Sequence, residues 1–175
     1  MAINTRLLSI TAGSLLCLSF IFFIVSNAVP IWSKFTYEST EITTGLWRIC
    51  SSAPNIKTCV AISCPSESDE TSFCSKILTA RAFVTLACIL SGISAICLVV
   101  YAIQGDKTPR ILLLATKGLV FACLIMGIIG VAVGINATVS GDSLIKLDFG
   151  AAAIIGIVAI IINFIGAIIT ALIRP

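Results

Sequence analysis

The segment from residue 30 to residue 64 decides which fold this chain adopts. It reads PIWSKFTYESTEITTGLWRICSSAPNIKTCVAISC and is polar, yet rich in β-branched and aromatic residues. Such residues favour strands over helices. We therefore expect a small antiparallel sheet with strands at Ile31–Tyr37, Thr43–Cys50, Lys57–Ile62 and Ser72–Leu78.

Four cysteines fall in the same polar part of the chain, namely Cys50, Cys59, Cys64 and Cys74. A sheet this small buries little apolar surface, so disulfide bonds are expected to stabilise it. Four cysteines in one polar loop suit an oxidising compartment, which places this loop outside the cell. The residues alone allow three pairings of four cysteines, and all three remain open at this point.

Outside this segment the chain is strongly apolar. Of its 175 residues, 58% are hydrophobic and only 11% are charged, with a mean hydropathy of +1.14. A membrane helix needs roughly 20 mostly apolar residues. Four segments qualify, at about 7–29, 82–103, 111–135 and 150–173. We therefore expect one domain over residues 1–175, a mainly α four-transmembrane-helix bundle with a small disulfide-stapled extracellular antiparallel β-sheet.

Two of these segments have a second interpretation. Arg6, the apolar run after it and the small pair Ser26 and Ala28 also suit a cleaved signal peptide. A signal-peptide core has only about 7–15 residues, so we expect an uncleaved helix. Lys117 falls inside the third segment, and we expect its side chain to reach the lipid headgroups from a helix that extends into the cytoplasm.

Four spans place both termini on one side of the membrane. Lysine and arginine are concentrated near the helix ends on that side, which favours it as the cytoplasmic one. The cysteine-rich loop then lies outside, as its chemistry also suggests. We expect a multi-pass plasma-membrane protein with cytoplasmic termini and with extracellular loops at residues 30–81 and 136–149.

Small residues repeat at steps of three and four along three of the expected helices. Because small side chains let helices approach closely in lipid, we expect these stripes to pack inside the bundle, with oligomer contacts as the alternative. The stripes are Thr85, Cys88, Gly92 and Ala95 in the second span, Gly127, Gly130 and Gly134 in the third, and Ala152, Gly156, Ala159, Asn163, Gly166 and Thr170 in the fourth.

Polar and thiol groups within the spans need partners or burial. Asn163 lies near the middle of its span, so its amide is expected to bond another helix of the same bundle, with a partner's docking site as the alternative. The four cysteines outside the loop are expected to be small buried hydrophobic residues. Palmitoylation is an alternative for Cys97. These four are Cys17, Cys88, Cys97 and Cys123.

Two further patterns lie on the expected outer face. Asn136-Ala137-Thr138 is a glycosylation sequon, but it lies so close to the membrane that we expect it to be unused. Glu67, Asp69 and Glu70 cluster between two cysteines. We interpret this cluster as a solvated turn; the alternative is a charge-selective patch that favours cations.

No feature of the sequence indicates an enzyme. The chain has no histidine, the commonest general base and a frequent metal ligand. It has no motif for a nucleotide, a metal or haem, and its net charge of +3 is too small to indicate nucleic-acid binding. We expect no enzyme activity and no cofactor.

The loop carries a recognisable set of residues: Trp32, Gly45-Leu46-Trp47, Cys50, Cys59 and, at the start of the second span, Arg81. This set resembles the signature of the claudin superfamily, which includes claudins, peripheral myelin proteins and calcium-channel gamma subunit-like four-span proteins. The resemblance implies that Cys50 pairs with Cys59, which leaves Cys64 and Cys74 to pair. That second pair departs from the plain claudin pattern.

Both tryptophans are expected where the sheet meets the headgroups, since amphipathic rings favour that depth. For Trp32, a simple aromatic belt is an equal alternative.

The resemblance implies two classes of function. The first is a junctional protein that meets copies of itself or related four-span proteins in cis and in trans and forms a paracellular barrier or charge-selective pore. The second is an auxiliary subunit, of the gamma or receptor-regulatory type, of an ion channel or receptor. Arg48 directly after the triplet and the extra cysteines also suit the second class.

The chain ends at Arg174-Pro175, just after the last span, whereas typical claudins carry a scaffold-binding tail. We therefore expect no tail-mediated link to a scaffold.

Overall fold

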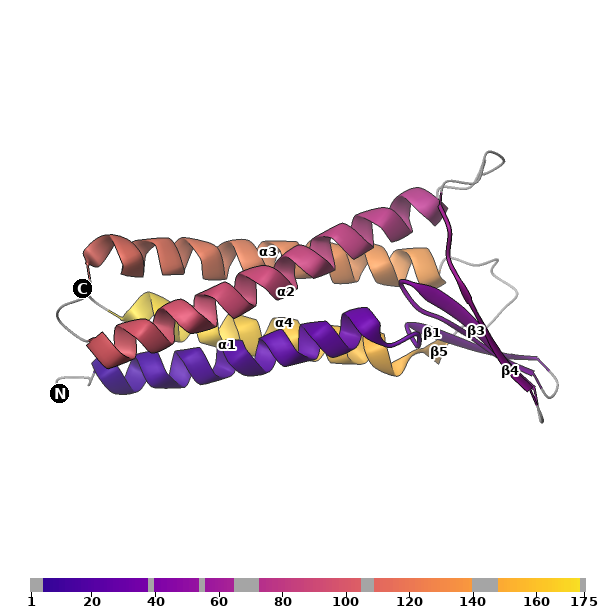
Figure 1. Ribbon diagram of the computed structural model, residues 1–175, viewed down its shortest axis with the longest axis horizontal. Coiled ribbons are helices and arrows are strands. Elements are labelled where there is room, and N and C mark those ends of the chain that lie inside the picture. The colour runs from indigo at the N-terminus through magenta and orange to yellow at the C-terminus, as the bar shows by residue number, and fades with distance from the viewer. Residues whose placement is uncertain are drawn as a thin grey trace.

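The computed structural model describes residues 5–37, 40–53, 56–64, 73–104, 109–139 and 148–173. In this part of the chain four long helices form a bundle, and a sheet projects from one end of it (Figure 1). The helices are α1 (Thr5–Ala28), α2 (Phe73–Gln104), α3 (Arg110–Val139) and α4 (Ala151–Leu172). All four are long and apolar enough to cross a membrane, with hydropathies of 2.3 to 2.8. The predicted four-span architecture is confirmed.

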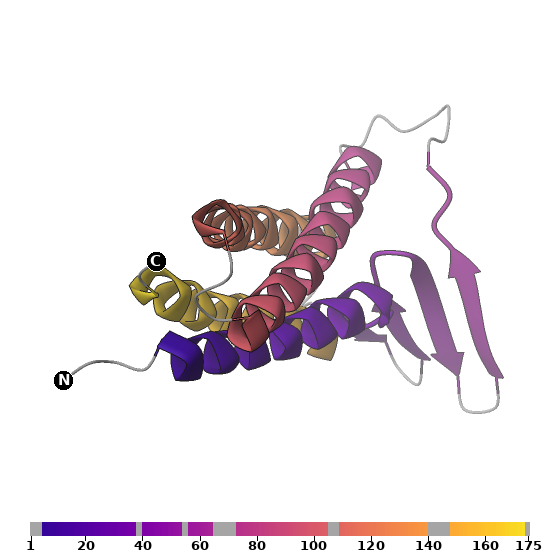
Figure 2. The ribbon, with the colours of Figure 1, turned by 60° about the vertical axis from the view of Figure 1, so that its left-hand side comes forward.

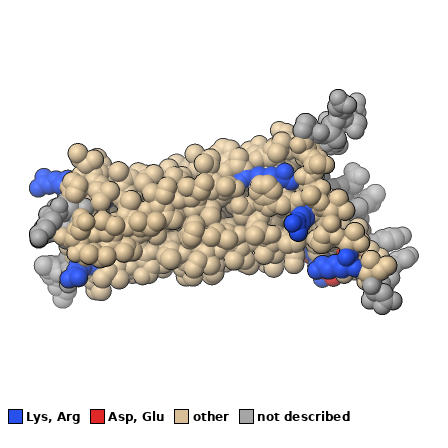
Figure 3. Space-filling model, in the orientation of Figure 1, with Lys and Arg blue, Asp and Glu red and all other residues tan. Residues whose placement is uncertain are grey.

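The distribution of the charged side chains agrees with a membrane-spanning bundle. On the face drawn in Figure 3, the lysine, arginine and carboxylate groups of the described residues lie toward the two ends, and a broad uncharged band separates them. The start of α1 and the end of α4 lie at the end opposite the sheet (Figure 1, Figure 2). A band without charge is what the hydrocarbon core of a bilayer requires of a protein surface.

The sheet is antiparallel throughout, with the strand order β4-β3-β2-β1-β5. Its strands are β1 (Ser33–Tyr37), β2 (Thr40–Thr44), β3 (Arg48–Ala53), β4 (Ile56–Ala61) and β5 (Asp148–Phe149). The short β5 comes from the chain between α3 and α4, in the predicted second extracellular loop, and pairs with the start of β1. The sheet therefore joins both predicted extracellular loops.

Two of the predicted strands need correction, and one observed strand was not predicted. The predicted strand Thr43–Cys50 is broken at residues 45–47, so that β2 and β3 are separate strands. The predicted strand Ser72–Leu78 is wrong because α2 begins at Phe73. Ile77, Ala80 and Val84 are fully buried at helical spacing, so the apolar face of the span continues outward and keeps this segment helical. The strand β5 was not expected.

Glycines set the distance between the helices. A Cβ atom at Gly130 would lie 2.8 Å from the backbone nitrogen of Val84, and one at Gly156 would lie 2.8 Å from Ser26 Oγ. These approaches leave no room for a side chain and let α3 contact α2 and α4 contact α1 closely. All nine small or polar packing residues predicted on α3 and α4 are buried: Gly127, Gly130, Gly134, Ala152, Gly156, Ala159, Asn163, Gly166 and Thr170.

Of the stripe predicted on α2, only Ala95 lies on the buried face. Thr85, Cys88 and Gly92 are only half-buried, whereas Val84, Ala87 and Ser91, one residue earlier at each step, are fully buried. The space over Gly92 is filled by the Phe20 ring of α1, whose Cε2 would lie 3.1 Å from a Cβ there. At Gly130 of α3 the neighbour from α2 is therefore the larger Val84, and Gly92 faces Phe20 of α1 instead.

The free cysteines are not uniformly buried as predicted. Cys123 is buried, Cys88 and Cys97 are half-buried, and Cys17 is exposed. In a bilayer an apolar side chain gains little by leaving lipid for protein, because both surroundings are apolar. A thiol on the outer face of a span is therefore tolerated, and the prediction is wrong for Cys17.

Polar side chains link the helices in the middle of the bundle. Asn163 Nδ2 donates to Cys123 Sγ on α3 over 3.2 Å, so its partner belongs to the same bundle. Ser19 and Ser26 of α1 donate to the carbonyls of Ala159 and Ala152 of α4, over 3.0 and 2.8 Å. In lipid these groups find no water, so each bond ties α4 to a neighbouring helix.

Lys117 has protein partners at the end of α4, and the depth of its side chain relative to the headgroups stays a prediction. Its Nζ donates to the carbonyls of Ala171 and Ile173, over 3.1 and 2.8 Å. The last carbonyls of a helix lack intrahelical donors, and a cation near them is favourable. Lys117 of α3 therefore caps the C-terminal end of α4.

Candidate functional site

The candidate site is the base of the sheet, where β1, the residues between β2 and β3, and the outer ends of α1 and α2 meet. Trp32 lies at its centre and is fully buried. Its indole Nε1 donates to the Ser26 carbonyl over 2.8 Å, and its ring lies against α3 so closely that a Cβ on Gly134 would be 2.6 Å from Cζ3. The aromatic-belt alternative is wrong for Trp32, because a belt residue would face lipid.

The backbone around Trp32 ties three parts of the chain together. Its amide donates to the Thr44 carbonyl at the end of β2, over 2.8 Å. Its carbonyl accepts from Gly150, over 2.9 Å, just before α4 begins. A Cβ on Gly150 would overlap the Ile31 carbonyl group, so glycine is required at this crossing. The sheet is thus held against the start of α4.

The Gly45-Leu46-Trp47 triplet forms the bend between β2 and β3. A Cβ on Gly45 would overlap Pro30 Cα, so a side chain cannot be placed there. The Gly45 amide donates to the Arg48 carbonyl over 2.9 Å. Leu46 then points inward and is fully buried. Each residue of the triplet therefore has a separate steric role.

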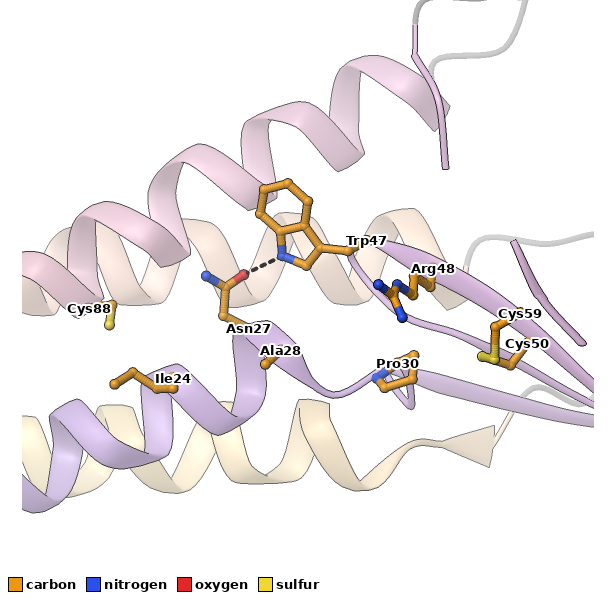
Figure 4. A pocket seen from close by; sticks show the side chains of 9 residues that line it. All are labelled: Ile24, Asn27, Ala28, Pro30, Trp47, Arg48, Cys50, Cys59 and Cys88. Carbon is orange, nitrogen blue, oxygen red and sulfur yellow. Dashed lines mark hydrogen bonds between the residues drawn. A yellow bond between two sulfur atoms is a disulfide. The ribbon is translucent and has the colours of Figure 1, made fainter. Parts of the chain in front are cut away.

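Trp47 connects the sheet to two helices through one amide side chain. Its Nε1 donates to Asn27 Oδ1 over 2.9 Å (Figure 4). Asn27 Nδ2 in turn donates to Thr85 Oγ1 of α2 over 3.1 Å. Trp47 itself is 45% exposed, as expected of a ring that lies where the sheet meets the membrane surface.

Arg81 of α2 binds both ends of the β3–β4 hairpin. Its Nε donates to the Leu46 carbonyl over 2.7 Å, and its Nη2 donates to the Ile62 carbonyl over 3.1 Å. Its guanidinium carbon lies 4.8 Å from the centre of the Trp47 ring, a cation–π contact. The fixed fork of the guanidinium suits two carbonyls that lie side by side. Arg81 therefore fixes the hairpin to α2.

Two disulfide bonds close the same region. Cys50 and Cys59 are directly opposite each other on β3 and β4, with their Cα atoms 4.1 Å apart. Cys64 is bonded to Cys74, with the Cα atoms 5.8 Å apart, and so links the chain after β4 to the first turn of α2. The pairing is the one that the claudin resemblance implies.

A groove runs beside this junction. It has a volume of about 560 Å³. Figure 4 shows the side chains that line it, which come from α1, α2 and the sheet. They are Ile24, Asn27, Ala28, Pro30, Trp47, Arg48, Cys50, Cys59 and Cys88. The described residues include no group of three or more histidines, cysteines and carboxylates that could hold a metal ion.

The other predicted site residues lie away from the junction or outside the described residues. Asn136 is exposed near the end of α3, and its sequon is helical, with Thr138 buried and its Oγ1 donating to the Gly134 carbonyl over 2.9 Å. Glu67, Asp69 and Glu70 lie outside the described residues.

The roles of Asn27 and Ser26 at this junction were not predicted from the sequence. The available signal for Asn27 was an amide side chain near the end of an apolar span.

Comparisons with known proteins agree with this geometry. The model of the PMP-22/EMP/MP20/Claudin family matches residues 5–170 of the chain. A search of curated proteins finds no match. The matched range covers α1, α2, α3, all but the last two residues of α4, and the sheet, including the two tryptophans, the Gly45-Leu46-Trp47 triplet and the Cys50–Cys59 bond. The chain is therefore a multi-pass membrane protein that belongs to the PMP-22/EMP/MP20/Claudin family.

Proposed function

We propose that the chain acts at cell–cell contacts, where its sheet meets copies of itself or related four-span proteins and forms a paracellular barrier or charge-selective pore. Family membership points to a non-enzymatic structural or channel-associated membrane protein. Two disulfides beside the sheet favour an oxidising compartment. We therefore place the sheet outside the plasma membrane and both termini in the cytoplasm.

The observation that supports this proposal best is the exposed strand β4. All residues from Ile56 to Ala61 are exposed, and the apolar side chains of Ile56 and Val60 are 69% and 65% exposed. Within the described part of the chain, no strand pairs with the outer edge of β4. An exposed edge presents unpaired amide and carbonyl groups that favour pairing with a strand of another molecule.

The pairing of β3 with β4 indicates which backbone groups face outward. Cys50 and Cys59 are opposite each other at 4.1 Å, close to the roughly 4.5 Å of a pair that exchanges no hydrogen bonds. Because such pairs alternate with bonded ones, the amides of Lys57, Cys59 and Ala61 point away from β3. These three residues would supply the bonds to a partner strand.

Proline at one of these positions tests the edge. Lys57→Pro removes an outward amide and leaves the bonds between β3 and β4 in place, since proline is tolerated on an edge strand. Lys57→Ala removes the same side chain but keeps the amide, and is the matched control. We expect the tagged wild-type chain and Lys57→Ala to concentrate where two expressing claudin-free epithelial cells touch, and Lys57→Pro to lose this enrichment.

Transepithelial conductance is measured on the same cells. A change in conductance or in charge selectivity with the wild-type chain, absent with Lys57→Pro, would support a paracellular role. Uniform surface staining of the wild-type chain with unchanged conductance would contradict the proposal. That result would favour the auxiliary-subunit alternative, which purification of the native complex and identification of a channel or receptor core would then test.

A further inference from the structure

The groove between α1, α2 and the sheet, here called the α1–α2 groove, opens onto the lipid-facing surface. Ile24, on its wall, is 43% exposed, and Ile21, about one turn deeper on α1, is 48% exposed. Both residues lie in a membrane-spanning helix, so the exposed area faces lipid. The groove is therefore open to the bilayer.

The lining changes in character along the groove. Ile24, Ala28 and Cys88 form an apolar part farther from the sheet, Arg48 forms a cationic part beside the sheet, and Trp47 and Asn27 lie between them (Figure 4). Ile24 and Ala28 are four residues apart on a helix, so the apolar part covers about 6 Å of membrane depth. The apolar part lies deeper in the membrane and the cation lies nearer to the sheet. This order matches the order of the acyl chain and the phosphate along a phospholipid.

Arg48 is the charged group of the groove. Its side chain is exposed, and the described residues provide it with no hydrogen bond or ion pair. Asn27, the other polar group on the wall, already bonds Trp47 and Thr85. A guanidinium binds phosphate through two parallel charge-assisted hydrogen bonds, which makes a phosphate the ligand best suited to Arg48.

The volume of the groove favours a lipid chain over a helix of another protein. A helix has a diameter of about 10 Å and a pitch of about 5.4 Å, so each turn occupies about 400 Å³. The groove, at about 560 Å³, would hold little more than one such turn. It falls within the range of about 300–1,000 Å³ that is usual for sites of small organic ligands.

We propose that the α1–α2 groove is a binding site for one glycerophospholipid of the leaflet next to the sheet, with phosphatidylcholine as its test ligand. The lipid phosphate binds Arg48, and one acyl chain lies along Ile24, Ala28 and Cys88. The proposal depends on membrane insertion of the helices and is independent of whether the sheet forms junctions. A lipid in this position would brace the sheet against α1.

The test uses the full chain in phosphatidylcholine nanodiscs. Phosphatidylcholine with a photoreactive acyl chain is compared with a diacylglycerol that carries the same chains but no phosphate. Cross-linked residues are mapped by mass spectrometry. We expect the phospholipid to label the peptides around Ile24 and Cys88, and unlabelled phosphatidylcholine to compete. Diacylglycerol is expected to label them about tenfold less, the factor that corresponds to a loss of about 1.4 kcal/mol.

Two pairs of variants separate the phosphate contact from the chain contact. Arg48→Gln should reduce phospholipid labelling to the level of diacylglycerol, whereas Lys57→Gln, a cation on the same face of the sheet that does not line the groove, should not. Ile24→Trp should fill the groove and reduce labelling by both lipids, whereas Ile21→Trp, outside the groove, should not. Size-exclusion profiles show that each variant is folded.

Three results would overturn the proposal. The first is labelling at the groove no stronger than at Ile96, a lipid-facing residue of α2 that is 66% exposed, which would indicate bulk lipid only. The second is equal labelling of wild type and Arg48→Gln by the phospholipid. The third is protection of the groove by a co-purified protein whose helix cross-links to Ile24.

Discussion

Trp32 and Trp47 attach the sheet to the helices in different ways. Trp32 is a packing residue, because its ring is enclosed by the bundle and its one polar group is satisfied by the Ser26 carbonyl. Trp47 is a polar connector, because its ring remains 45% exposed while its nitrogen binds Asn27. A substitution should therefore affect stability at Trp32 through volume and at Trp47 through the loss of a hydrogen bond.

Gly134 provides a direct test of the packing at Trp32. A Cβ there would lie 2.6 Å from the indole Cζ3, so Gly134→Ala forces the ring or α3 to move. We expect the free energy of unfolding to fall by about 1–3 kcal/mol, as for other overpacked cores. Thermal unfolding in detergent micelles measures the change.

Gly118→Ala is the matched control, because no atom lies within 4 Å of a Cβ at that position of the same helix. Both variants gain the same helix propensity, so the difference between them isolates the clash. Equal unfolding midpoints for the two variants would show that Trp32 is not confined as described.

At the scale of the elements, α4 is held at both of its ends by other parts of the chain. Its first turn follows Gly150, whose amide donates to Trp32, and the Ala152 amide donates to the Ile31 carbonyl over 2.9 Å. Its last turn is capped by Lys117 of α3. The most apolar helix of the bundle is therefore positioned by polar contacts at its two ends, where lipid gives way to water.

Lys117→Met tests the cap on α4. The substitution keeps an unbranched apolar chain but leaves the carbonyls of Ala171 and Ile173 without their donor. We expect a loss of about 1–3 kcal/mol and faster hydrogen exchange at the amides of the last turn of α4. Hydrogen–deuterium exchange with mass spectrometry measures the exchange of this turn separately from that of the rest of α4.

Arg110→Met is the comparison, because Arg110 is an exposed cation at the start of α3 for which the described residues show no such contact. Faster exchange in α4 with both variants, or with neither, would argue against a cap by Lys117.

At the scale of the whole molecule, the sheet and the bundle are stabilised differently. The helices form their backbone hydrogen bonds internally and carry apolar side chains, so the bilayer stabilises them. The sheet is small and has an exposed edge strand, and its attachment depends on Arg81, Trp47 and two disulfides. The sheet should therefore open without loss of the helices when the disulfides are removed.

Joint replacement of Cys50 and Cys59 by serine should show this separation. Closing a loop of this length stabilises a fold by about 3 kcal/mol through chain entropy. Trypsin cleavage at Arg48 and Lys57 should then accelerate about 100-fold, with the helical circular dichroism unchanged. Cys17→Ser, at an exposed free thiol, is the control and should cleave like wild type. Parallel loss of helix signal and protease resistance would mean that sheet and bundle unfold as one unit.

The positions of the four spans could be predicted from the sequence because apolar length alone dictates them in a bilayer. The secondary structure was harder to predict where the same segment suits both a helix and a strand. The segment around Ile77 has strand-forming residues, yet it is helical because Ile77 and Ala80 are buried against the bundle. The strand β5 was out of reach, since two residues carry no periodic signal and pair only because α4 begins beside Trp32.

The sequence by itself determined the membrane class, the cysteine-rich loop and the set of residues that marks the family, since each depends on composition or local spacing. Only the tertiary structure decided what those residues do. Arg81 binds carbonyls of Leu46 and Ile62, which lie far from it in the chain, and Asn27 links Trp47 to Thr85. The α1–α2 groove exists only because a helix end and a hairpin meet there, a contact between distant segments that local sequence does not encode.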